Sequence, residues 1–358
     1  MTKRLISLLF LASGAAIEDE PPHAIPGKIY RSASQTIPPS AGPRVDHGIG
    51  ACITADFICW TARMEHLSVV QTGISAGNIH ANKGNTNYPD WRWKPGFKLG
   101  LGLALPRDGR DADADYTFLD SEAWNSNREN NQDLFPCRNI ANLFPLIHTD
   151  TVQGAKATWR FHFNAIDLSF GRNYFIGKFL KMRPFIGCKG SRIDQDYHLN
   201  YDVVTTELDS NLRMKNKQKY WGIGLRTGLN TARHSTQTSS IYGNLALSGL
   251  WSRFEVDRKD SRNDSRNAAG PTNPPLDTLL TVVKTGDHFH TLKAIPEIGI
   301  GMRREWRSFE DRYRFLIQLG WEQQLWINHN RLIIFSPMQA NQGDLMLQRL
   351  TVKARLDF

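Results

Sequence analysis

The segment Gly73-Ile-Ser-Ala-Gly77 has the spacing of a nucleophile elbow, in which a serine attacks an ester or amide carbonyl. This chemistry requires a strand before the serine and a helix after it. Residues 67–72 could form the strand, but residues 78–90 are rich in Asn and Gly and predict a loop. The chain also lacks the alternating strands and helices that hold a hydrolase triad. We therefore interpret Ser75 as part of a surface loop and expect no catalytic residues.

Three aspartates, Asp111, Asp113 and Asp115, alternate along one face of a predicted strand. They could suggest a Ca²⁺ site, but the EF-hand loop requires Gly at its sixth position, which Tyr116 occupies. Like charges at this spacing repel one another unless cations answer them. We interpret the aspartates as an acidic patch facing a basic wall across a pore, where a transverse field would sort small ions. Candidates for the basic wall are Lys98, Arg160, Lys181, Arg183, Arg226, Arg314 and Arg355.

Histidines and cysteines offer little further chemistry. His288 and His290 share one face of an extended chain, but a metal ion would require more ligands, so we interpret them as a rim or interface pair. The four cysteines show no metal-ligand spacing. Cys52 and Cys59 differ in parity, so on a straight strand they face opposite sides and cannot pair with each other. We expect neither a metal nor another cofactor.

Composition limits the class of protein. Hydrophobic residues make up 40% of the 358 residues, which argues against wholesale disorder. No apolar run approaches the roughly 18 residues of a spanning helix, which excludes a helical membrane protein. A membrane β-barrel remains open because its walls alternate apolar and polar residues. The net charge of +9 favours anionic partners, but the basic residues are scattered, so we expect no nucleic acid among them.

The N-terminal region predicts export. Residues 1–16 combine a basic start, a short apolar stretch and small residues, which is typical of a secretory signal peptide, with a buried N-terminal helix as the alternative. Residues 17–48 contain six prolines and predict a periplasmic lead-in or a segment that plugs a lumen. The remaining residues, 49–358, are assigned to a single β domain.

Alternation with a period of two predicts strands along this domain. In the clearest strand, residues 91–105, Leu99, Leu101 and Leu103 share one face with further large apolar residues, while small or charged residues occupy the other face. The other predicted strands are 111–118, 159–164, 221–229, 313–322 and 350–358, with weaker ones at 51–66, 177–189, 191–205, 240–257 and 289–306, and a twelfth candidate at 140–148.

Three features favour a membrane barrel over a soluble β-sandwich. The polar strand faces are rich in Gly and Ala, which suit strands where another group approaches closely or the sheet curves. Several tryptophans lie near strand ends, as in the aromatic girdles of membrane barrels, namely Trp91, Trp93, Trp221, Trp306, Trp321 and Trp326. The third feature is the connections, which are short at 106–109 and 307–310 and long at 67–90, 120–138, 258–288 and 328–343.

Closure of such a sheet is expected because every backbone N–H and C=O in lipid requires a partner. We predict an all-β fold, a closed antiparallel transmembrane β-barrel of about 12 strands, with roughly 10 to 16 as the range. A lumen of this size leaves room for water and small solutes.

Several stretches are similar to one family, the pore-forming major outer-membrane proteins of Legionella and the chlamydia-like bacteria. The matching stretches are ADFICW at 55–60, WKPGFKLG at 93–100, YT at 116–117, IDLSFGR at 166–172, LKMRPFIG at 180–187, IDQ at 193–195, GIGLRTGLN at 222–230 and LQRLTVKARLDF at 347–358. The resemblance runs from about residue 50 to the end. Arg349 departs from the family pattern, which more often has Gly and a bulge there.

The resemblance implies a barrel that conducts small solutes and contributes to the cell envelope, with no catalytic residues to transfer. It also implies that the assembly machinery recognises the terminal aromatic Phe358. Because envelopes of the chlamydial relatives are disulfide-bonded, the resemblance leaves disulfide cross-links between molecules as an alternative.

The predicted function is an outer-membrane porin for passive diffusion of small hydrophilic solutes, with a weak preference for anions and a structural role in the envelope. The alternative is a surface adhesin or structural barrel with a closed lumen; an outer-membrane lipase using Ser75 and a soluble exported sandwich are further alternatives. Expected partners are outer-membrane lipid and lipopolysaccharide, the barrel-assembly machinery, small hydrophilic solutes and, as an option, further copies of the chain. The predicted pore-lining residues are Lys98, Asp111, Asp113, Asp115, Arg160, Lys181, Arg183, Arg226, Arg314, Glu322, Lys353 and Arg355.

Overall fold

The computed structural model describes residues 50–72, 85–105, 109–128, 134–140, 151–176, 179–204, 208–236, 238–266, 277–307, 313–334 and 342–358. The predicted signal peptide and lead-in, Ser75 and nearly all of the twelfth strand candidate lie outside these residues. The described residues form strands, turns and irregular segments. Among them, no helix is long and apolar enough to cross a membrane.

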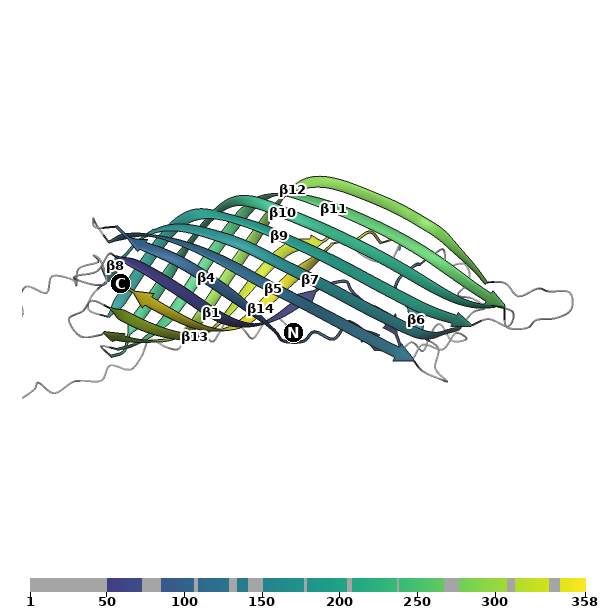
Figure 1. Cartoon of the computed structure of the whole chain (residues 1–358), viewed down its shortest axis with the longest axis horizontal. Helices are drawn as coiled ribbons and strands as arrows, with labels where there is room; N and C mark the ends of the chain where they lie inside the picture. Colours follow the sequence, from purple (N-terminus) through teal and green to yellow (C-terminus); the bar gives the residue numbers. More distant parts are fainter. Residues whose placement is uncertain are drawn as a thin grey trace, which may run out of the picture. The chain divides into compact units, whose positions relative to one another are not determined.

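Ten long strands form a closed antiparallel barrel (Figure 1), which confirms the predicted fold class. Each strand pairs with the next along the chain, and β14 pairs with β1 to close the sheet. The barrel strands are β1 (Ala51–Met64), β4 (Lys94–Ala104), β5 (Arg110–Arg128), β7 (Thr151–Arg172), β9 (Leu180–Val204), β10 (Leu208–His234), β11 (Ser239–Arg266), β12 (Asp277–Arg307), β13 (Arg314–Asn330) and β14 (Gly343–Asp357). The short strands are β2 (Val70–Gln71), β3 (Thr86–Asn87) and β6 (Phe135–Pro136), which pair together, and β8 (Tyr174–Ile176), which pairs with β9.

The structure joins two of the predicted strands. Segments 177–189 and 191–205 form the single strand β9, because the ladder continues through Gly190, whose partners are Ile166 and Ile223. A glycine interrupts the side-chain pattern but leaves the backbone hydrogen bonds intact. Ile140, the one described residue of the twelfth candidate, is not in a strand.

Parts of the predicted long loops are also strand. β5 continues to Arg128, and β11 and β12 occupy most of the segment 258–288. These parts looked like loops because they are rich in polar and charged residues, whereas backbone pairing does not depend on side-chain polarity.

An apolar belt covers the outer face of the barrel. Leu99, Leu101 and Leu103 point outward, and Leu101 is 65% exposed. Exposed large apolar or aromatic side chains occur on each of the ten barrel strands, at residues such as Phe57, Tyr116, Leu168, Ile186, Ile223, Leu247, Ile300, Leu319 and Val352. The predicted outward orientation of this face is therefore confirmed, because lipid is the solvent that such a face requires.

The apolar face changes sides along individual strands. On β7, Ile166 and Leu168 are exposed to the outside, whereas Trp159, Phe161 and Phe163 are buried inside the barrel. The ladder between β5 and β7 has no register shift at this point, so the parity change is in the sequence and not in the backbone. On the long-loop side of the belt, the outward positions of β7 are polar and its lumen-facing positions are apolar, as in a soluble protein. The strands therefore extend beyond the membrane.

Connections differ in length at the two ends of the barrel. The end with residues 105–109, 235–238 and 308–313 is the short-turn rim, and the end with residues 65–93 and 331–342 is the long-loop rim. Outer-membrane barrels have short periplasmic turns and longer extracellular loops. This asymmetry follows the predicted pattern.

The belt can be tested with Leu101→Lys. A lysine facing the bilayer interior costs about 2–4 kcal/mol, so we expect the free energy of unfolding in lipid vesicles to fall by about that amount. Urea titration followed by heat-modifiable gel mobility measures it. Leu101→Phe is the matched control and should retain wild-type stability. Equal stability of all three proteins would contradict the lipid-facing assignment.

Candidate functional site

The half of the lumen near the short-turn rim contains a cavity of about 1110 Å³. Nine Lys or Arg side chains and six Asp or Glu side chains lie on its wall, so basic groups exceed acidic ones by three. All come from strands whose other face forms the belt. A closed barrel thus surrounds a charged, water-accessible space.

Ten of the twelve predicted lining residues are on this wall, namely Lys98, Asp113, Asp115, Lys181, Arg183, Arg226, Arg314, Glu322, Lys353 and Arg355. Asp111 is buried behind Arg183 and accepts a hydrogen bond from it. The prediction that Arg160 lines the pore is wrong. Its side chain is 58% exposed on the outside of the barrel, where it pairs with Glu122. It lies above the belt, where outward positions are polar.

The aspartates of the predicted acidic patch form ion pairs with basic residues on the same wall. They do not face a separate basic wall across open water. The Arg183 guanidinium donates to Asp111 at 2.6 Å and to Asp113 at 2.8 Å. Asp115 pairs with Lys98 at 3.0 Å. Arg183 reaches from β9 across β7 to β5 because Gly171 has no side chain, and a Cβ there would overlap the guanidinium. The predicted reason for glycine on these faces, close approach of another group, applies here.

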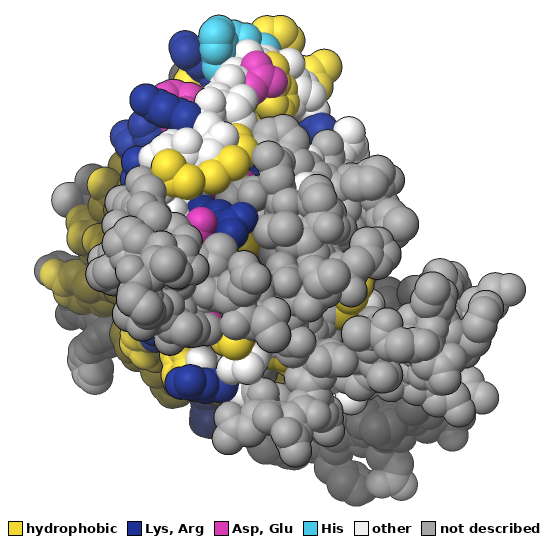
Figure 2. Space-filling view, turned by 90° about the vertical axis from the view of Figure 1, so that its right-hand side faces the viewer, with side chains coloured by type: hydrophobic (Ala, Val, Ile, Leu, Met, Phe, Trp, Pro, Cys, Tyr) yellow, Lys and Arg dark blue, Asp and Glu magenta, His cyan; other side chains and the backbone are white. Residues whose placement is uncertain are grey.

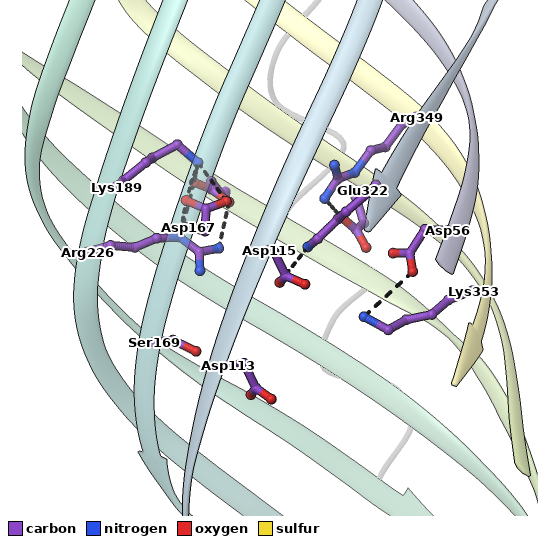
Figure 3. A network of polar contacts seen from close by, with 12 residues as sticks. Asp56, Asp113, Asp115, Asp167, Ser169, Lys189, Arg226, Glu322, Arg349 and Lys353 are labelled. Atoms are coloured by element: carbon purple, nitrogen blue, oxygen red, sulfur yellow. Dashed lines mark hydrogen bonds and ion pairs between the residues drawn. The ribbon is translucent and has the colours of Figure 1, made fainter. Parts of the chain in front are cut away.

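A buried charge network crosses the lumen (Figure 3). Lys189 is fully buried and lies 3.0 Å from Asp167 and 2.9 Å from Glu297, and Arg226 pairs with Glu297 at 2.8 Å. Glu297 is on β12 and Lys189 is on β9, with two strands between them in the sheet. The contact therefore spans the curved wall, and each charge has an opposite partner, as buried charges require.

Arg349 belongs to a neighbouring set of ion pairs. Its guanidinium pairs with Glu322 and lies 4.8 Å from the ring of Trp60, while Lys353 lies 3.7 Å from Asp56 (Figure 3). The ladders of β14 with its two neighbours show no register shift at Arg349, so no bulge is present at this departure from the family pattern.

Seven charges of the cavity wall and its network were not predicted, namely Asp56, Asp167, Lys189, Glu297, Arg303, Glu305 and Arg349. Parity offered a signal for two of them, since Arg349 shares a face with Lys353 and Lys189 shares one with Arg183. The pairing of Lys189 with Glu297 had no sequence signal, because 108 positions separate them.

An aromatic core fills the lumen on the long-loop side of the cavity. We define it by Trp60, Phe163, Tyr220, Phe254 and Trp326, which come from five different barrel strands and are buried. Ring centroids of Trp326 lie 5.8 Å from those of both Phe163 and Tyr220 in edge contacts. Such contacts across a lumen are those of a protein interior. Trp326, predicted as a girdle residue, is thus in the interior.

Backbone segments fold into the lumen beside this core. Tyr201 donates a hydrogen bond to the Val69 carbonyl at 2.6 Å, and Gln218 donates to the His329 carbonyl at 2.9 Å. Residues 65–72 and 328–334 therefore occupy space that the prediction assigned to water. The lumen thus has two parts, a charged cavity with room for water and small solutes and a packed core.

The remaining candidates do not form a second site. Cys52 faces the lumen, Cys59 faces outward, and none of the four cysteines, all of which are described, forms a disulfide. His288 and His290 are exposed, and His290 stacks on Trp251 at 5.8 Å. Within the described part of the chain, no group of three or more His, Cys, Asp or Glu could hold a metal ion.

The closed barrel, its apolar belt and its charged lumen define an outer-membrane β-barrel protein. Residues 52–358 match the family described as Legionella pneumophila major outer membrane protein precursor, and the chain belongs to this family. The predicted family and the outer-membrane location are confirmed. A comparison with curated proteins gave no match.

Solved structures that are similar to this chain include the following three. The outer membrane protease OmpT from Escherichia coli is 8% identical over 86% of this chain and 96% of that chain, with a TM-score of 0.40. A major outer membrane protein from Thermus thermophilus is 11% identical over 84% and 99%, with a TM-score of 0.25. The toluene transporter TodX from P. putida is 7% identical over 86% and 89%, with a TM-score of 0.28.

Proposed function

We propose that the chain is an outer-membrane porin through which small hydrophilic solutes diffuse passively. The observation that carries the proposal is the charged cavity of about 1110 Å³ inside a closed barrel. Membrane barrels with polar interiors are typically channels, and charged walls select among ions. The proposed function uses no catalytic group and no cofactor.

A weak preference for anions is part of this proposal. Basic side chains on the cavity wall exceed acidic ones by three, so the mean potential there is positive. Most of these charges are paired, which limits the field and makes the preference weak.

The aromatic core and the segments 65–72 and 328–334 stand between the cavity and the long-loop rim, so conduction requires a second arrangement in which these segments and the core side chains open a passage. A state of this kind can be a minor one and still conduct, because its population sets only the fraction of open time. We therefore expect brief openings of low total conductance.

Single-channel recording of the detergent-purified protein in a planar bilayer tests the proposal. Discrete openings with a chloride-favouring reversal potential in a KCl gradient are expected. A complete absence of openings from protein with heat-modifiable gel mobility would overturn it.

Lys353→Glu tests the charge argument. The substitution lowers the excess of basic groups on the wall from three to one, so we expect the reversal potential to move toward potassium selectivity. Lys217→Glu makes the same charge change on the outer surface and should leave selectivity unchanged. Equal shifts in both variants would assign selectivity to overall charge and not to the cavity.

A second candidate is a structural barrel with a closed lumen. The aromatic core favours it, because the buried side chains fill the lumen at its level. The recording separates the two functions, since a closed barrel gives no openings.

Export and assembly complete the proposal. Residues 1–16 would direct export, and Phe358 would be the assembly signal. The backbone of Phe358 exchanges two hydrogen bonds of 3.0 Å with Ala51, at the seam where the barrel closes.

A further inference from the structure

Strand β12 has a long free edge on the long-loop side of the apolar belt. It pairs with β11 along nearly its whole length, but with β13 only from Glu297 to Arg307. Residues 277–296 therefore have one neighbouring strand among the described residues, and in Figure 1 β12 forms the upper border of the ribbon. A strand edge of this kind presents a row of N–H and C=O groups that lack strand partners.

Residues 280–288 of β12 are exposed or partly exposed on both faces, whereas further along the strand the lumen-facing Lys293 and Ile295 are buried. Leu292, on the outer face, is 72% exposed, and Asp287, on the lumen side, is exposed as well. The adjacent strand β11 differs, since its lumen-facing Phe254 and Val256 are buried. Figure 2, viewed from the long-loop rim, shows histidine, basic, acidic and hydrophobic side chains at the upper border of the molecule. Nothing in the described part of the chain covers this edge as a paired strand.

Three lysines on adjacent strands form one rung that ends at the free edge. Lys215 on β10 is opposite Lys259 on β11, which is opposite Lys284 on β12, and all three are exposed. None of them forms an ion pair with a described residue. Like charges directly opposite one another are unfavourable in a sheet.

Neighbouring rungs differ from the lysine rung because their lysines form ion pairs with carboxylates. Lys217 lies 3.7 Å from Asp196, and Lys219 lies 3.8 Å from Glu255. At the lysine rung, the next position beyond Lys284 is the free edge itself, so a carboxylate there would come from outside the described sheet.

We infer that the β12 edge binds an extended segment of a partner protein, which adds as a strand and places an acidic residue beside Lys284. Addition of a strand uses backbone hydrogen bonds for affinity and side chains at alternate positions for specificity. The acidic residue would complete the lysine rung, and apolar residues of the segment would cover Leu292 and the half-exposed Leu280. This inference does not depend on conduction.

Two other occupants fit the edge less well. A phosphate group of a glycolipid accepts hydrogen bonds but donates few, so the edge carbonyls would stay unpaired. A second copy in the same membrane would place its own Lys284, and not a carboxylate, at the height of the lysine rung.

Two synthetic peptides test the inference on the full-length protein in detergent. One is Thr-Val-Thr-Glu-Thr-Val-Thr, and the other replaces its Glu with Lys; binding is measured by fluorescence anisotropy and by hydrogen exchange. We expect the acidic peptide to bind at least about tenfold more tightly than the lysine peptide. The reason is that its Glu forms an opposite-charge pair with Lys284, whereas the Lys of the other peptide forms a like-charge contact. Protection should be confined to residues 277–296.

Variants separate the edge from general charge. Lys284→Glu should reverse the preference between the peptides, whereas Lys215→Glu, two strands away on the same rung, should change it less than about threefold. No binding of either peptide, equal effects of both substitutions, or protection by lipopolysaccharide vesicles in place of the acidic peptide would each overturn the inference. Self-association that protects the same residues without peptide would overturn it in favour of a second copy.

Discussion

Truncation of the aromatic core is expected to open the lumen. In the double variant Phe163→Ala and Trp326→Ala, unitary conductance should rise several-fold and open time should lengthen, because two rings in contact across the lumen are removed. Each truncation costs about 3–5 kcal/mol of stability in a packed interior, with non-additivity because the rings touch. Single-channel recording in a planar bilayer measures the effect.

The control for this prediction is Trp251→Ala, which removes a ring of the same kind from the outer surface. It should leave conductance unchanged. Trp326→Leu preserves more of the packing and should raise conductance less, and it replaces the double variant if that protein fails to fold. Wild-type conductance from a correctly folded double variant would show that the core does not restrict the passage.

Loss of one carboxylate should destabilise the charge network strongly. In Glu297→Gln, the fully buried Lys189 and the nearby Arg226 share Asp167 as their remaining acidic partner. Removal of one member of a buried ion pair costs about 3–5 kcal/mol, because an uncompensated buried charge remains. We expect the urea midpoint in lipid vesicles to fall accordingly and, in protein that folds, the reversal potential to move further toward anions.

Glu255→Gln is the matched control for the network. Glu255 makes a solvent-exposed pair with Lys219 at 3.8 Å, and pairs of this kind contribute about 0–1 kcal/mol. A similar loss of stability in both variants would mean that the Glu297 network is no more important than a surface contact. A loss confined to Glu297→Gln, with intact folding at low urea, would agree with the structure.

The lumen contents show where sequence reasoning reached its limit. Ten predicted wall residues lie on the cavity, because in lipid the apolar face must be outward and parity then sends the polar face inward. The prediction for Arg160 was wrong for a related reason. Its strand extends beyond the membrane, where polar side chains face outward and apolar side chains face the lumen. The switch from buried Phe163 to exposed Ile166 in the sequence marks that boundary.

The sequence by itself determined the class of fold, the lipid-facing surface and the family, because alternation with a period of two reports the solvent on each side of a strand. Only the tertiary structure decided what fills the barrel. Contacts such as Lys189 with Glu297, or Phe163 with Trp326, depend on strand order and on the diameter of the closed sheet. Side-chain alternation assigns a residue to a face, but it contains no information about which residue on a distant strand that face will meet.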